Sequence, residues 1–150
     1  MICAFFVSFV ELMQLPPSVF LIGSMKAGST SLSKALVDHP NFCNDPIKEK
    51  HFFDHNSNYV GGVQWFMKRF PTECTTTSVD YLTLDATPNY IRFNHVPGLM
   101  KEFYGPDELA KKKFILILRD PVSRLVMVIV HKYTPIYIHI HTFMHQAYMH

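Results

Sequence analysis

The stretch VFLIGSMKAGSTSL, residues 19–32, decides the fold of this chain. It opens with four apolar residues that follow two prolines, which predicts a short buried strand. Residues 23–28 contain two glycines and predict a loop, and the apolar positions of residues 30–38 recur at helical spacing before Pro40. The segment therefore predicts a strand, a glycine-containing loop and a helix in direct succession.

This loop gathers the groups that bind a phosphate. A helix N-terminus offers unpaired backbone N–H groups and the positive end of the helix dipole. Gly28 lets the backbone approach an anion closely, Lys26 adds a full charge, and the hydroxyl side chains of residues 29–31 add donors. An ordinary turn with a helix cap is the alternative interpretation. A nucleoside triphosphate loop is disfavoured, because here the lysine precedes the second glycine instead of following it.

The rest of the chain alternates predicted helices and strands. Apolar spacing predicts helices over residues 60–70 and 97–104, the second ending at Gly105. Residues 81–84 and 114–118 predict strands, and the second has no polar alternation, so we expect both of its faces to be buried. The alternation predicts an α/β fold of three layers, with a central parallel sheet flanked by helices and ligands beyond the carboxyl ends of the strands.

The composition is typical of a globular domain. Hydrophobic residues make up 48% of the 150 residues and charged residues 17%, which excludes a disordered chain. The net charge of +2 is too small to indicate nucleic acid binding, so any anion site must be local. Three scattered cysteines give neither a disulfide framework nor a zinc spacing, although they leave a Cys43–Cys74 bridge open.

Both ends of the chain depart from this pattern. Residues 1–15 are apolar, but they fall short of the roughly 20 apolar residues that span a bilayer. They fit a remnant of a membrane anchor or an apolar lead-in packed on the domain. The C-terminal segment is rich in histidine, and we interpret it as low-complexity sequence and expect no metal, although His139, His141 and His145 have a spacing that could bind one.

Four segments, in order along the chain, resemble the sulfotransferases that use 3′-phosphoadenosine 5′-phosphosulfate (PAPS), and most closely the heparan sulfate group. Residues 20–32 resemble the 5′-phosphosulfate-binding motif, and residues 48–54 resemble a lysine-glutamate and double-phenylalanine segment. Residues 85–90 resemble a threonine-proline-x-tyrosine segment, and residues 114–124 resemble the 3′-phosphate-binding strand and loop. The resemblance implies a P-loop-like sulfotransferase domain that is incomplete at the C-terminus.

On this basis we divide the chain into an apolar lead-in at residues 1–17, the N-terminal part of a sulfotransferase domain at residues 18–125 and an aberrant His/Tyr/Ile-rich tail at residues 126–150. The resemblance further implies a lumenal domain at the Golgi membrane, held there by an N-terminal anchor. Its partner would be a glycan acceptor.

The resemblance also implies a role for each candidate site residue. Lys26 would stabilise charge on the bridging oxygen as the sulfuryl group leaves, and Arg119 would hold the 3′-phosphate. Glu49 would be the base that deprotonates the acceptor hydroxyl or amine, with His51 as the alternative base. The 5′-phosphate would be held by Ala27, Gly28, Ser29, Thr30 and Ser31.

Two positions depart from the family pattern. Ala86 stands near the place of a lysine, and Met127 stands where the family has a serine, eight residues after Arg119. Methionine cannot donate the hydrogen bond that a serine would give to the 3′-phosphate. The sequence thus predicts a PAPS-dependent sulfotransferase acting on a heparan-sulfate-like glycan. A truncated, non-catalytic homologue with weak nucleotide binding is the alternative, and a P-loop nucleotide kinase is a lesser one.

Overall fold

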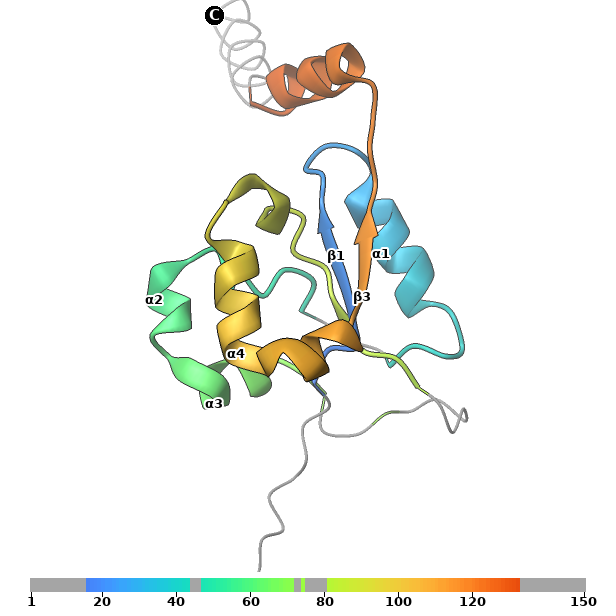
Figure 1. The fold of residues 1–150 in the computed structure, drawn as a ribbon. Helices are drawn as coiled ribbons and strands as arrows, with labels where there is room; N and C mark the ends of the chain where they lie inside the picture. Colours follow the sequence, from blue (N-terminus) through green and yellow to red (C-terminus); the bar gives the residue numbers. More distant parts are fainter. Residues whose placement is uncertain (1–15, 44–46, 72–73, 75–80, 133–150) are drawn as a thin grey trace, which may run out of the picture.

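The computed structural model describes residues 16–43, 47–71, 74 and 81–132 of the chain. Three parallel strands form a sheet in the order β2–β1–β3, with bounds β1 Val19–Gly23, β2 Leu84–Asp85 and β3 Lys113–Leu116. The helices are α1 Ser29–Val37, α2 Asn56–Tyr59, α3 Gly62–Met67 and α4 Val96–Ala110, and a 3₁₀ turn covers Tyr90–Arg92. Figure 1 shows α1 on one side of the sheet and α2, α3 and α4 on the other. This arrangement confirms the predicted α/β fold with a parallel sheet between helices.

Alternation of side chains along β1 gives the domain two apolar cores, one on each face of the sheet. Phe20 packs into an aromatic cluster with Phe52 and Phe53 on the side of α4. Val19 and Leu21 pack on the other face against α1. Since Phe52 and Phe53 are fully buried, their role in this structure is core packing.

The predicted elements are right in kind and differ at their boundaries. The first strand and helix are found within a residue of the predicted positions. The helix predicted over residues 60–70 is the shorter α3, and the strand predicted over residues 81–84 pairs with β1 only from Leu84 onward. Gly105, predicted as a helix end, interrupts α4 with φ 73° and ψ 162°, after which the chain resumes a helical course.

The prediction that residues 114–118 are buried on both faces is wrong. Phe114 and Leu116 are each 45% exposed, whereas Ile115 and Ile117 pack into the core on the α1 side. In the part of the chain that the structure describes, β3 forms the edge of the sheet and only β1 pairs with it. A continuous apolar run is buried on both faces only where other elements cover both of them.

A disulfide joins Cys43 to Cys74, so the bridge that the sequence left open is formed. It ties the segment that follows α1 to the segment that follows α3. The backbone N–H of Cys43 also donates to the carbonyl oxygen of Leu82 at 2.8 Å. Disulfides persist in oxidising compartments and are rare in the cytosol.

Several predictions fall on parts of the chain without a description. The N-terminal lead-in up to residue 15, and His139, His141 and His145, lie outside the described residues. A search of the described helices finds none that is both long enough and apolar enough to cross a membrane. The domain boundary at residues 125 and 126 stays a prediction, and a helix of residues 121–132 runs through it.

Candidate active site

The predicted phosphate-binding loop leaves the carboxyl end of β1 and enters α1. Lys26 has φ 61° and Gly28 has φ 105°, so the loop turns through two left-handed residues. The first hydrogen bond of α1 runs from Leu32 N to Gly28 O at 3.0 Å. The N–H groups of residues 29–31 therefore have no acceptor inside the helix and are free to bind an anion.

The loop lies against the segment that follows β3. Because β1 and β3 are parallel neighbours, Lys26 and Arg119 both follow carboxyl ends at the same edge of the sheet. Ser24 N donates to Ile117 O at 2.8 Å, and Arg124 Nη1 donates to Ser24 Oγ at 3.1 Å. Among the described residues, Lys26 has no ion-pair partner, so its charge is available to a ligand.

Asp120 starts the helix that carries this second segment. Ser123 N donates to Asp120 Oδ1 at 2.8 Å, and this hydrogen bond is the main reason why the pKa of Asp120 is lowered. Pro121 occupies the first helical position, where its missing N–H costs nothing. The sequence indicates no separate role for Arg124, which donates a hydrogen bond to Ser24 of the predicted phosphate-binding loop, since nothing in its spacing indicates a partner 100 residues away. Met127, at the family's serine position, is exposed on the same helix.

The two candidate bases are in direct contact with each other. Glu49 Oε2 lies 3.1 Å from His51 Nε2, and His51 Nδ1 lies 2.8 Å from Asp54 Oδ2. The Asp54 side chain is fully buried and also accepts a hydrogen bond from Asn89 Nδ2 at 2.8 Å. Asp54 therefore orients the imidazole ring, and the ring in turn holds Glu49. A doubly protonated imidazole donates to both carboxylates, whereas a neutral ring leaves one of the two contacts without a proton.

Lys48 joins this group to the phosphate loop. Its Nζ donates to Glu49 Oε1 and to Thr30 Oγ1, each at 2.9 Å. Thr30 stands in the first turn of α1, so one side chain spans the distance between the predicted donor site and the predicted base. The structure thus brings together Lys48, Glu49 and Thr30, which are up to 19 residues apart in the sequence.

A buried polar network fixes the backbone beneath these side chains. Lys50 N donates to Thr87 Oγ1 at 3.0 Å, and Thr87 Oγ1 donates to Asp85 Oδ1 at 2.6 Å. Phe52 N donates to Tyr90 Oη at 3.2 Å, and Tyr90 Oη donates to Asp85 Oδ2 at 2.9 Å. The Asp85 side chain at the end of β2 is therefore linked through two hydroxyl groups to the backbone on both sides of residue 51.

The residue between these two anchors has an unusual conformation. His51 has φ 53°, a left-handed value that is uncommon outside glycine. Its carbonyl oxygen accepts a hydrogen bond from Asn58 Nδ2 at 2.7 Å. Such conformations persist where the surroundings fix them, and they often occur at functional sites. Here the left-handed turn belongs to the residue whose ring contacts both Glu49 and Asp54.

Burial also keeps the hydroxyl of Tyr90 protonated. Desolvation raises the pKa of Tyr90 well above its ordinary value, and the nearby charge of Asp85 raises it further. Tyr90 therefore remains a hydrogen-bond donor to Asp85 throughout the physiological pH range.

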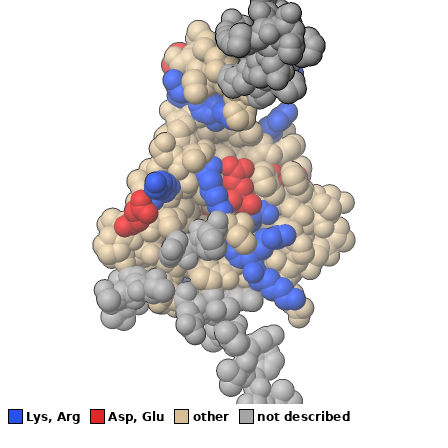
Figure 2. Space-filling model, turned by 180° about the vertical axis from the view of Figure 1, so that it is seen from behind, with Lys and Arg blue, Asp and Glu red and all other residues tan. Residues whose placement is uncertain are grey.

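Charged side chains cluster on one part of the surface. Figure 2 shows several Lys and Arg side chains close to a small acidic patch on the face opposite to the view of Figure 1. Although the net charge is only +2, this face presents concentrated positive charge.

Comparison with known proteins settles the family. The model of the sulfotransferase domain matches residues 16–145. The chain belongs to the sulfotransferase family. Its relatives include heparan sulfate sulfotransferases, which confirms the resemblance found in the sequence.

Three relatives of this sulfotransferase chain show the extent of the similarity. It is 38% identical over 109 residues to the membrane-associated sulfotransferase kil1 of Dictyostelium discoideum, covering 72% of this chain and 21% of that protein. It is 41% identical over 117 residues to the bifunctional heparan sulfate N-deacetylase/N-sulfotransferase 1 of Caenorhabditis elegans, covering 72% and 12%. It is 28% identical over 116 residues to the heparan sulfate glucosamine 3-O-sulfotransferase 5 of Mus musculus, covering 77% and 31%. The matched region is thus less than a third of each of these relatives.

The buried network predicts unequal effects of removing two buried tyrosine hydroxyls. Tyr90→Phe should lower the free energy of unfolding by about 1–3 kcal/mol, because Phe52 N loses its acceptor and Asp85 loses a donor. Tyr104→Phe is the matched control, since the Tyr104 hydroxyl is buried and has no hydrogen-bond partner among the described residues, and it should cost nothing or stabilise slightly. Urea denaturation measures both. Equal losses in the two variants would show that the Asp85 network contributes no more than packing.

Proposed function

We propose that this chain transfers a sulfuryl group from PAPS to a hydroxyl or amine of a heparan-sulfate-like glycan. The observation that carries the proposal is the pair of hydrogen bonds that the Lys48 ammonium group donates. One goes to Thr30 in the first turn of α1 and the other goes to Glu49. Glu49, the proposed base, is thus separated from the anion-binding N-terminus of α1 only by the Lys48 side chain. This arrangement suits an in-line transfer, in which most of the catalysis is positioning and charge stabilisation.

The donor would occupy the edge of the sheet where β1 and β3 end. The free N–H groups at the start of α1, together with the hydroxyl groups there, would hold the 5′-phosphate. Arg119 would hold the 3′-phosphate from the segment after β3. Lys26 would lie beside the bond that breaks. The residues assigned to the 5′-phosphate are Ala27, Gly28, Ser29, Thr30 and Ser31.

The chemistry then needs one proton acceptor and one leaving group. The acceptor oxygen or nitrogen attacks sulfur, a new S–O or S–N bond forms, and the bond from sulfur to the 5′-phosphate oxygen breaks. Glu49 takes the proton of the acceptor, and His51, held by Asp54, stabilises the carboxylate before that transfer. Lys26 stabilises the negative charge that develops on the departing phosphate oxygen.

A Golgi location follows from the same proposal. The Cys43–Cys74 disulfide suits an oxidising lumen. One relative is described as a membrane-associated sulfotransferase, and others are described as heparan sulfate enzymes. We propose that the domain works on the lumenal side, with an anchor supplied by sequence outside the described residues.

A second candidate is a non-catalytic homologue that binds nucleotide at most weakly. It is favoured by Met127, which stands at the family's serine position and cannot donate a hydrogen bond to the 3′-phosphate, and by the exposed face of β3. The two experiments below separate binding from transfer.

Nucleotide binding should appear as a rise in melting temperature. Adenosine 3′,5′-bisphosphate at about 100 times its dissociation constant stabilises a folded protein by about 2.7 kcal/mol. Lys26→Ala should reduce this shift, whereas Lys101→Ala on α4, across the sheet, should leave it unchanged. The measurement is a thermal melt with and without nucleotide. A magnesium-dependent shift with ATP, and none with the bisphosphate, would instead support a kinase and contradict the proposal.

Glu49→Gln should abolish transfer while leaving nucleotide binding intact. Loss of a general base lowers the rate by roughly 10²–10⁴-fold, and glutamine keeps the size of the side chain but cannot take the proton. The measurement follows radiolabelled sulfate from PAPS onto an unsulfated heparan polysaccharide. His51→Gln serves as the comparison and should lose less. A larger loss in His51→Gln than in Glu49→Gln would identify the histidine as the base.

A further inference from the structure

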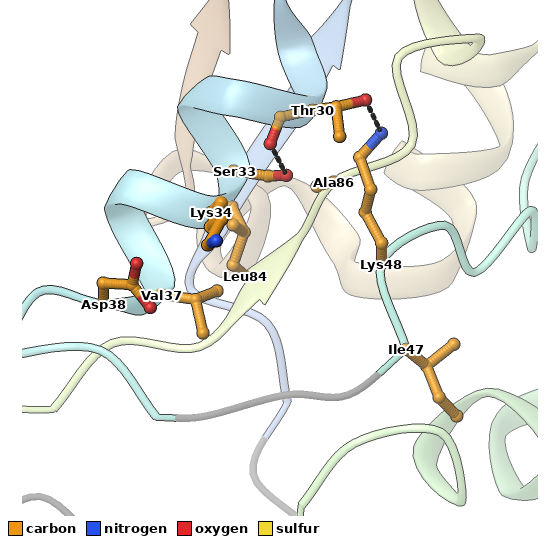
Figure 3. A pocket seen from close by; sticks show the side chains of 9 residues that line it. All are labelled: Thr30, Ser33, Lys34, Val37, Asp38, Ile47, Lys48, Leu84 and Ala86. Carbon is orange, nitrogen blue, oxygen red and sulfur yellow. Dashed lines mark hydrogen bonds between the residues drawn. The ribbon is translucent and has the colours of Figure 1, made fainter.

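A cavity of about 310 Å³ lies beside the site, between α1 and residues 47–48. One of its walls is a single face of α1, formed by positions i, i+3, i+4, i+7 and i+8 of the helix. Figure 3 shows these side chains along the helix, opposite the segment that carries Lys48. The residues of α1 and its C-cap that line the cavity are Thr30, Ser33, Lys34, Val37 and Asp38.

The floor and the rim of this cavity differ in character. Leu84 and Ala86 of the β2 segment form an apolar floor, and both are buried. Lys34 and Lys48 place two ammonium groups on the lining, and Asp38 adds one carboxylate. A sugar ring has a matching distribution, with an apolar C–H face and polar groups around its edge.

Lys48 lies at the end of the cavity that is next to Glu49, the proposed base. In Figure 3 it crosses from its own segment to Thr30. Its ammonium has three donors, of which two are used by Thr30 and Glu49, so one remains for a ligand. A ring in the cavity would therefore have Glu49 as a near neighbour, just beyond the Lys48 side chain.

We propose that this cavity binds an acidic sugar residue of the acceptor chain, next to the residue that receives the sulfuryl group. Its carboxylate or sulfate pairs with Lys34 and Lys48 and its apolar face packs on Leu84 and Ala86, whereas the Asp38 carboxylate on the same lining repels the negative charge of the ligand. The inference rests on the proposed function, because it assigns to that reaction a subsite for substrate recognition. Ala86 contributes by its small size, since a longer side chain there would fill the floor of the cavity.

The charges on the two sides of the cavity predict effects of opposite sign. Lys34→Gln should weaken binding of an unsulfated heparan octasaccharide by about two- to fivefold, the range expected for an exposed ion pair. Asp38→Asn should strengthen binding of the same octasaccharide by up to a similar factor, because it removes a repulsion. Lys101→Gln, an exposed lysine on α4 across the sheet, is the matched control and should have no effect.

The probe is the octasaccharide and a second sample whose carboxyl groups have been reduced to alcohols, with the dissociation constant measured by calorimetry. The inference predicts that Lys34→Gln weakens only the acidic form. Equal effects on both forms, effects of the same sign in Lys34→Gln and Asp38→Asn, or no binding of the octasaccharide to the unsubstituted chain would overturn it. Failure of the proposed function looks different, because the bisphosphate would then give no thermal shift and PAPS no transfer, while the charge-dependent binding would persist.

Discussion

The buried carboxylate of Asp85 is the constraint on which the site depends. It sits at the end of β2 with no exposed surface, and a buried charge of this kind is stable only where hydrogen bonds and partners compensate it. Thr87 and Tyr90 supply two of those hydrogen bonds. Their hydroxyl oxygens also accept hydrogen bonds from the backbone N–H groups of Lys50 and Phe52. The same few residues thus connect the sheet, the aromatic core and the turn that presents Glu49 and His51. Loss of any member leaves a buried polar group unpaired, so the network is fixed as a unit.

The parallel sheet explains why the charges meet where they do. Three strands that run in one direction deliver the phosphate loop, the Asp85 segment and the Arg119 segment to a single edge. Lys48 then bridges Thr30 in the first turn of α1 and Glu49, the proposed base, with two hydrogen bonds of 2.9 Å. Because these groups come from distant parts of the sequence, their spacing is set by the register of the strands and by the Asp85 network. A flexible loop by itself would not keep Glu49 and the first turn of α1 at a constant separation.

The sequence could predict the strand, loop and helix around Lys26, because local apolar spacing and the glycines determine them. The family motifs also indicate Glu49, His51 and Arg119 as candidate site residues; that assignment stays a prediction, while the structure places Glu49 and His51 in contact. The sequence could not predict the exposure of Phe114 and Leu116, since exposure depends on which element covers β3 and not on the apolar run itself. Nor could it predict that Arg124 contacts Ser24, or that Glu49 and His51 form one hydrogen-bonded group, because both depend on contacts made in three dimensions.

We expect the Asp85 network to hold the Glu49 turn in position for the proposed transfer, independently of donor binding. Thr87→Val tests it most directly, because valine keeps the shape of threonine and removes the hydroxyl that links Lys50 N to Asp85, while Thr87→Ser keeps that hydroxyl. The measurement is the transfer rate at saturating PAPS, taken below the melting midpoint of both variants, together with the thermal shift produced by adenosine 3′,5′-bisphosphate. We expect a rate at least about tenfold lower in Thr87→Val, a nearly unchanged rate in Thr87→Ser, and the same nucleotide shift in both. A Thr87→Val variant that transfers sulfate at the unsubstituted rate would contradict it.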